Sequence, residues 1–127
     1  MNPIRVPKAS TNEAAAQALT KATLRAAALL GLTNAALADV VGLSESTISR
    51  MNSGKPFELG TKPAELATLL VRLYRSLDAL VGNNEAQRQA WMNSYNDALH
   101  AVPGQAVRGA EGLVRVLTYV DGARALT

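Results

Sequence analysis

The chain has 127 residues, of which 48% are hydrophobic and none is cysteine; this suits one compact domain, or two small domains that share a core, without disulfides or thiolate metal sites. The net charge is +3 and His100 is the only histidine, which excludes a multi-histidine metal site within one chain. No apolar run approaches the ~20 residues of a membrane span and the first residues lack the apolar core of a signal peptide, so we expect a cytoplasmic protein with no membrane partner.

The N-terminal end carries the whole excess of positive charge. Residues 1–33 contain four basic residues and one acidic residue, whereas the rest of the chain is balanced. The basic residues are Arg5, Lys8, Lys21 and Arg25, and the acidic residue is Glu13. Residues 1–10 hold two prolines and no periodicity, which predicts a flexible arm. A basic arm is favoured near phosphate, and a solvated tail explains Arg5 and Lys8 equally well.

The first helix is predicted to run to about Leu30 and to stop at Gly31. Ser10 or Thr11 can cap its start, with Glu13 favourable in the first turn. Its apolar stripe is expected to be buried and consists of Ala15, Ala18, Leu19, Ala22, Ala26, Leu29 and Leu30.

Residues 34–53 read as two short helices joined by a tight turn. Ala38 is small where the helices would cross, and Gly42, four residues later, supplies the positive φ that the turn needs. Ile48, six residues after Gly42, is expected to be buried and to anchor the second helix. The same apolar face includes Leu37, Val41 and Met51, while Thr33 and Ser44 can cap the two helices.

Between these anchors the second helix carries short polar side chains and one long donor, as a recognition helix in a DNA groove does. They are Ser44, Glu45, Ser46, Thr47, Ser49 and Arg50. Arg50 is the best candidate for a bidentate contact to guanine, worth ~1–3 kcal/mol of discrimination. Glu45 can accept from cytosine N4 or can simply stabilise the helix start. A helical hairpin that binds no DNA is the alternative.

The spacing resembles the Xre family of phage-repressor-like helix-turn-helix domains, including a closing Met51-Asn52-Ser53-Gly54-Lys55 that is similar to the family's L-x-N-G-K ending. The resemblance implies that Glu45, Ser46, Ser49 and Arg50 read base edges. Phosphate contacts are expected from Asn34, Ser44, Thr47, Asn52 and Lys55. One such unit binds weakly, so we expect a two-fold homodimer on an inverted repeat, with half-sites about 34–36 Å apart or a multiple of that distance.

A loop over residues 55–61, with Phe57 and Leu59 turned inward, leads to a long helix over residues 62–81 that Thr61 caps and Gly82 ends. Its leucines repeat at spacings of 4, 3, 4 and 3, which is a heptad-like seam too short for a free coiled coil. They are Leu66, Leu70, Leu73, Leu77 and Leu80, and they suit either the core or a dimer interface.

Three further helices are predicted in the C-terminal third. Asn83 or Asn84 caps the first, which carries Trp91 and ends near Met92; a short one follows Pro103. The last runs over about residues 111–123 and buries Leu113, Val116, Leu117 and Val120. No strand-like alternation is present, so the fold class is all-α with about seven helices.

Residues 91–124 carry a second resemblance. Trp91, Asn96-x-Ala98-Leu99, Pro103 and Glu111-Gly112-Leu113-x-x-Val116-Leu117-x-Tyr119-x-Asp121 are similar to the toxin-binding domain of the Xre/MbcA/ParS antitoxins. The resemblance implies a RES-domain, NAD-consuming toxin as partner. The residues assigned to toxin binding are Trp91, Tyr119, Asp121, Arg124 and Thr127. From chemistry alone the aromatic residues suit a core or an interface, and Arg124 suits a toxin carboxylate or its own helix C-terminus.

The chain departs from that family at one loop. Asn96-Asp97-Ala98-Leu99-His100-Ala101-Val102-Pro103 stands where the family usually has Asn-Pro-Ala-Leu-Gly-Gly, a polar residue and Pro. His100 thus replaces a small residue, and we assign it no functional role.

These observations predict a flexible arm over residues 1–10, an Xre-like helix-turn-helix domain over 11–60, and a small helical dimerisation and toxin-binding domain over 61–127. The expected function is that of an antitoxin that neutralises a RES toxin and represses its own operon. The alternative is a phage-type or ligand-responsive repressor without a toxin partner. We expect no enzyme, cofactor or metal, because the chain has one histidine, no cysteine and no Gly-rich phosphate loop.

Overall fold

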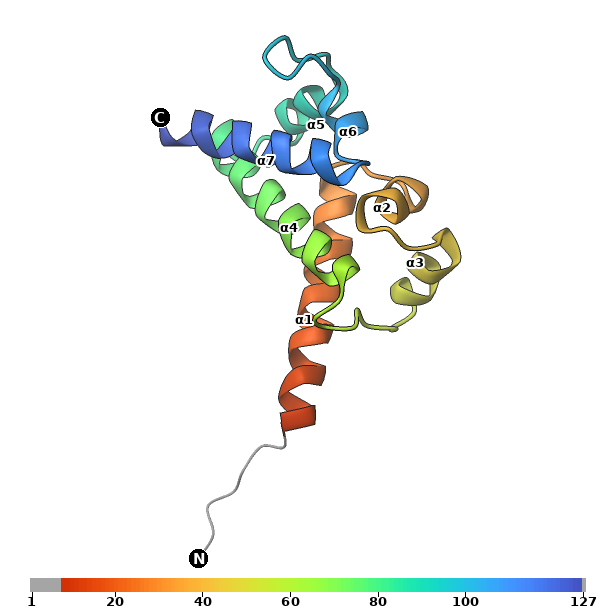
Figure 1. Cartoon of the computed structure of the whole chain (residues 1–127). Helices are drawn as coiled ribbons and strands as arrows, with labels where there is room; N and C mark the ends of the chain where they lie inside the picture. The colour runs from red at the N-terminus through yellow and green to blue at the C-terminus, as the bar shows by residue number, and fades with distance from the viewer. Residues whose placement is uncertain (1–7, 127) are drawn as a thin grey trace, which may run out of the picture.

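A computed structural model describes residues 8–126, and its regular elements are all helices (Figure 1). In chain order they are α1 (Lys8–Leu29), α2 (Asn34–Val41), α3 (Glu45–Asn52), α4 (Lys62–Val81), α5 (Glu85–Asn93), α6 (Pro103–Ala106) and α7 (Ala110–Ala125). The all-α prediction is therefore confirmed for this part of the chain. Most of the expected N-terminal arm, including Arg5, and the candidate Thr127 lie outside the described residues.

Side-chain caps begin four of the helices at the predicted residues. The side-chain oxygens of Thr33, Ser44, Thr61 and Asn84 each accept a hydrogen bond from the backbone N–H three residues later. The start of α1 differs, because the helix already begins at Lys8 and encloses both expected caps, Ser10 and Thr11. Lysine and alanine favour helix, so the alanine-rich sequence extends the first turn toward Pro7.

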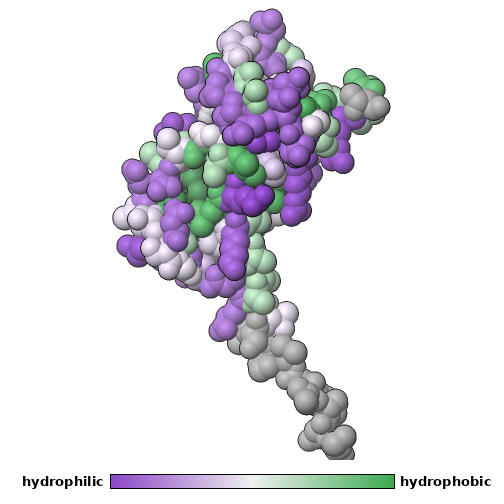
Figure 2. All heavy atoms as spheres, turned by 180° about the vertical axis from the view of Figure 1, so that it is seen from behind, coloured by the Kyte–Doolittle hydropathy of each residue, from purple (hydrophilic) through white to green (hydrophobic). Residues whose placement is uncertain are grey.

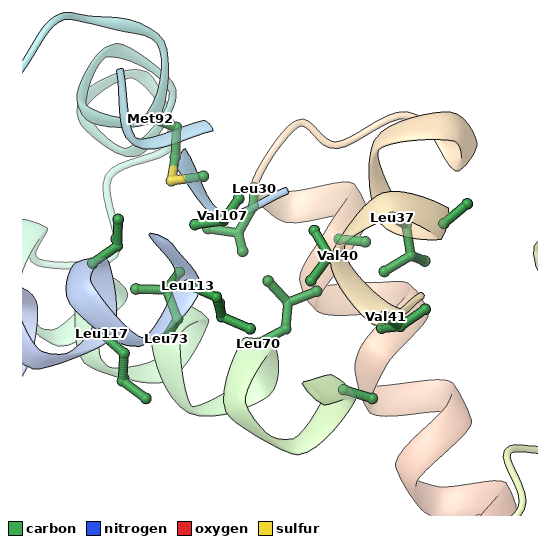
Figure 3. Close-up of a cluster of buried hydrophobic side chains, with 14 of the residues drawn as sticks. Leu30, Leu37, Val40, Val41, Leu70, Leu73, Met92, Val107, Leu113 and Leu117 are labelled. Atoms are coloured by element: carbon green, nitrogen blue, oxygen red, sulfur yellow. The ribbon is translucent and has the colours of Figure 1, made fainter. Parts of the chain in front are cut away.

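The hydrophobic core is built around α4. Leu70, Leu73 and Leu77 are fully buried within a single chain, whereas Leu66 and Leu80 are only half-buried. Figure 3 shows Leu70 between side chains of α2 and α7, and the same cluster continues to Met92 of α5. Of the two predicted roles for the leucine seam, its centre therefore has the core role.

The buried side of α1 agrees with the predicted one only in part: Ala26 and Leu30 are buried as predicted. Ala15 and Ala18 are exposed, and the buried stripe lies roughly a quarter turn away around the helix. It consists of Ala16, Thr20, Thr23, Ala26, Ala27 and Leu30. Two threonines are tolerated there because each hydroxyl donates to the carbonyl four residues earlier, at 2.7 Å.

Thr20 also fixes the loop that follows α3. Its hydroxyl accepts a hydrogen bond of 2.9 Å from the backbone N–H of Phe57, which is only 2% exposed. The prediction that Phe57 turns inward is thus confirmed. Its companion Leu59 is 41% exposed, so that half of the prediction is wrong. The loop places one apolar side chain in the core and leaves the other on the surface.

A buried arginine joins the C-terminal helices to the rest of the fold. Arg88 of α5 is 3% exposed; its Nε donates to the carbonyl oxygen of Leu29 and its Nη1 to Asp78 of α4, both at 2.8 Å. The guanidinium also lies 5.7 Å from the ring centroid of Tyr74. One side chain therefore connects the end of α1, the last turn of α4 and the start of α5.

Candidate functional site

The helix-turn-helix places α3 with one side in the core and the other in solvent. Ile48 and Met51 are buried against α2, and Gly42 ends α2 with a φ of 73°. On the opposite side the four predicted base-reading residues, Glu45, Ser46, Ser49 and Arg50, are all exposed. The exposed side of α3 carries the polar groups that a recognition helix needs.

Hydroxyl groups pre-arrange the exposed side of α3. The Ser44 hydroxyl lies 3.1 Å from that of Ser46 and 2.8 Å from that of Thr47. Arg50 donates from Nη2 to the Thr47 hydroxyl at 3.0 Å. The guanidinium is thus directed along α3 toward its N-terminus, beside the serines. We refer to Ser44, Ser46, Thr47, Ser49 and Arg50, together with Glu45, as the recognition face.

The remaining predicted phosphate contacts lie at the edges of this face. Asn34 is exposed at the first residue of α2, and Lys55 is exposed just after α3. Asn52 differs, since its side-chain amide donates to the carbonyl oxygen of Ile48 at 3.1 Å and so faces its own helix. Gln17 of α1, which was not predicted to matter here, donates to the carbonyl oxygen of Gly54 at 3.4 Å.

A second candidate surface lies where α5 and α7 meet. The rings of Trp91 and Tyr119 are stacked, with centroids 6.4 Å apart and planes inclined by 20°. Trp91 is half-buried and Tyr119 is 37% exposed, so the pair presents an aromatic edge to solvent. Tyr95, four residues after Trp91, is 60% exposed. We call the stacked pair of Trp91 and Tyr119 the aromatic face.

Two neighbours of the aromatic face were not among the predicted site residues. Tyr95 is one, and Arg115 is the other; Arg115 lies one helical turn before Tyr119 and donates to the carbonyl oxygen of Leu99 at 2.6 Å. This bond fixes the loop after α5, which also closes on itself through the bridge between Asn96 and Ala101. The four-residue spacing of Arg115 and Tyr119 on α7 was the available sequence signal for Arg115. Tyr95 lies beyond the end of α5, so no helical spacing relates it to Trp91.

The three other predicted partner-binding residues lie farther along α7. Asp121 accepts from the hydroxyl of Ser76 at 2.7 Å and from Arg72 at 3.4 Å, so its carboxylate holds α7 against α4. Arg124 is exposed in the last turn of α7. Thr127 lies outside the described residues. Trp91 and Tyr119 are thus brought together, whereas Asp121 has a structural role in the free chain.

A polar contact joins the helix-turn-helix to the C-terminal helices. Arg108, in the segment between α6 and α7, donates from Nε and Nη2 to one oxygen of Asp39 on α2, at 2.9 and 2.6 Å. Both side chains are about half exposed, so the contact adds little to stability. It does fix the C-terminal helices relative to the helix-turn-helix.

Comparison with known families assigns both halves of the chain. Residues 12–72 match the antitoxin Xre-like helix-turn-helix domain. Residues 76–125 match the antitoxin Xre/MbcA/ParS C-terminal toxin-binding domain. The chain belongs to the Xre/MbcA/ParS-type antitoxins. No curated protein matches it.

The recognition face of this antitoxin therefore belongs to its DNA-binding domain and the aromatic face to its toxin-binding domain. The two matches meet within α4, which spans Lys62–Val81. The two domains consequently share one continuous helix and one core. Within residues 8–126, no helix combines the length and hydropathy required to cross a bilayer.

Proposed function

We propose that this antitoxin neutralises a RES-domain toxin that consumes NAD, and that it represses its own operon as a homodimer on an inverted repeat. It acts by binding, without catalysis. The observation that carries the proposal is the toxin-binding domain directly following an exposed recognition face on the same core. Residues 61–127 provide toxin binding and dimerisation in this proposal.

On DNA, the recognition face enters the major groove. Arg50 leaves the Thr47 hydroxyl and donates two hydrogen bonds to guanine O6 and N7, which exchanges one hydrogen bond for a bidentate pair. Asn34 and Lys55 flank the face and contact phosphates. Few cations are available for these contacts, so a single chain binds weakly and a dimer is needed for operator affinity.

On the toxin, the aromatic face supplies the apolar contact area. Trp91 and Tyr119 are already stacked, so little side-chain freedom is lost on binding. Arg124, in the last turn of α7, reaches a toxin carboxylate, and Thr127 follows it at the chain end. Asp121 acts indirectly, because its bond to Ser76 fixes the direction of α7.

Co-expression with the RES-domain protein encoded beside this gene tests the toxin assignment. We expect a stable complex on size-exclusion chromatography, and cellular NAD that is depleted by the toxin alone but maintained when the antitoxin is present. Absence of a complex together with unrelieved NAD loss would favour the repressor without a toxin partner.

Two single substitutions separate the proposed activities. Arg50→Ala should abolish operator selectivity in a gel-shift assay and leave toxin binding intact, whereas Arg124→Glu should weaken toxin binding and leave operator affinity intact. Each residue is exposed, so both variants should remain folded. Unchanged operator preference in Arg50→Ala would refute the assignment of the recognition face.

A further inference from the structure

Helix α1 has a second apolar side that the folded chain leaves open. Ala15 and Ala18 are exposed and Leu19 and Ala22 are half-buried, although these residues form the strongest apolar stripe of the helix. Figure 1 shows the first turns of α1 extending beyond the other helices. Figure 2 shows polar residues along one side of this part of α1 and mildly hydrophobic ones along the other.

This open side forms one wall of a groove whose other wall is α4. Two adjoining hollows make up the groove and share Leu19 and Thr68. Ala64 contributes to the first hollow, and Ala22 and Val71 contribute to the second. The groove follows α4 for about 16 Å at the rise of an α-helix. We call it the α1–α4 groove.

The two ends of the groove carry opposite charge. Glu65 lines the first hollow, and Arg72 and Arg75 line the second. Glu65 is paired only with its exposed neighbour Lys62, at 2.9 Å, and Arg72 only weakly with Asp121, at 3.4 Å. A two-fold axis through the middle of the groove exchanges its ends. It therefore brings the acidic end of one chain against the basic end of another.

We propose that a second copy of this chain docks in the α1–α4 groove, about a two-fold axis near Leu19 and Thr68. The alanines let the two α1 helices approach closely, and the charges fix the antiparallel direction. The leucine seam cannot serve instead, because Leu70, Leu73 and Leu77 are already fully buried within one chain. The inference rests on the homodimer of the proposed function, but not on its operator or its toxin. It adds residues of α1 to a dimer interface that the proposed function placed within residues 61–127.

The groove takes no residue from α3, α5 or α7. The recognition face and the aromatic face therefore lie outside the interface. A dimer formed here keeps both available, so one assembly can hold DNA and toxin together.

Sedimentation velocity of the full chain, without DNA or toxin, tests the interface. Ala18→Glu places a charge on the apolar wall and should convert the dimer to a monomer. Its matched control, Ala28→Glu, makes the same change at an exposed position near the C-terminal end of α1 that does not line the groove, and should remain dimeric. A dimeric Ala18→Glu protein would overturn the proposed interface and leave the homodimer itself standing. A monomeric parent chain would overturn both, whatever its toxin binding.

A charge exchange tests the two-fold arrangement without touching the apolar wall. Glu65→Arg and Arg75→Glu should each raise the dimer dissociation constant at least tenfold, because each places like charges across the axis. The double variant should restore most of the parent affinity. Additive weakening in the double variant, or no change in either single variant, would overturn the arrangement. Because Glu65 and Arg75 are exposed, these variants remain informative even if Ala18→Glu does not fold.

Discussion

The buried threonines of α1 show that polar residues can occupy positions where the hydrophobic pattern predicts apolar ones. Thr20 and Thr23 replace aliphatic residues on the buried stripe, and both hydroxyls are satisfied by their own helix. Only Thr20 has a second partner, the N–H of Phe57. Its hydroxyl therefore supports the loop that supports the end of α3.

Thr20→Val should lower the free energy of unfolding by about 1–3 kcal/mol, because it leaves the buried N–H of Phe57 without an acceptor. Thr23→Val removes only a bond within α1 and should cost much less. Urea denaturation of the two variants measures the difference. Equal losses would mean that the bond to Phe57 contributes nothing.

His100 is held in an unfavourable backbone conformation. Its φ is +53°, in the left-handed region that favours glycine, and its side chain is exposed. His100→Gly should therefore stabilise the chain by about 1 kcal/mol, measured by thermal unfolding. Asn83, with a φ of +60°, is the matched control, since asparagine tolerates this region and Asn83→Gly should gain less. A destabilised His100→Gly protein would contradict this interpretation.

Among the helices, the contact of α7 with α6 depends on a missing side chain. Gly112, in the first turn of α7, lies against the backbone of Ala106, and a Cβ at this position would overlap the carbonyl oxygen of Ala106. The sequence motif that contains Gly112 identified the family, but only the packing explains why glycine is required there. The leucine seam of α4, in contrast, was predicted from its periodicity alone.

Gly112→Ala should destabilise the chain by about 1–3 kcal/mol or more, because backbone, unlike a flexible side chain, cannot move aside. Gly122→Ala is the matched control on the same helix, where a Cβ meets no atom within contact distance. That change should raise stability by about 0.5–1 kcal/mol. The two melting temperatures should move in opposite directions, and a shared direction would exclude the steric explanation.

At the scale of the whole molecule, the DNA-binding and toxin-binding domains form one folding unit. They share α4, and Arg88 ties α5 to α4 and to the end of α1. We therefore expect that neither domain unfolds alone.

Calorimetry should show a single unfolding transition for the full chain. Arg88→Met should lower the free energy of unfolding of the whole chain by roughly 3 kcal/mol, because Asp78 loses its buried partner. The carbonyl oxygen of Leu29 still accepts a hydrogen bond from Gln89. Arg25→Met changes an exposed residue of α1 and should leave the free energy of unfolding unchanged. Two separate transitions, in either the parent chain or Arg88→Met, would refute the single unit.

The sequence by itself determined the number of helices, the caps of α2 to α5 and the composition of the recognition face, because capping, glycine turns and hydrophobic periodicity act over a few residues. Thr33, Ser44 and Thr61 were assigned correctly for this reason. Tertiary structure alone decided three outcomes: the side of α1 that is buried, the exposure of Leu59, and the hydrogen bond between Asp121 and Ser76. These outcomes depend on neighbours that are distant in sequence, whose positions no local pattern specifies.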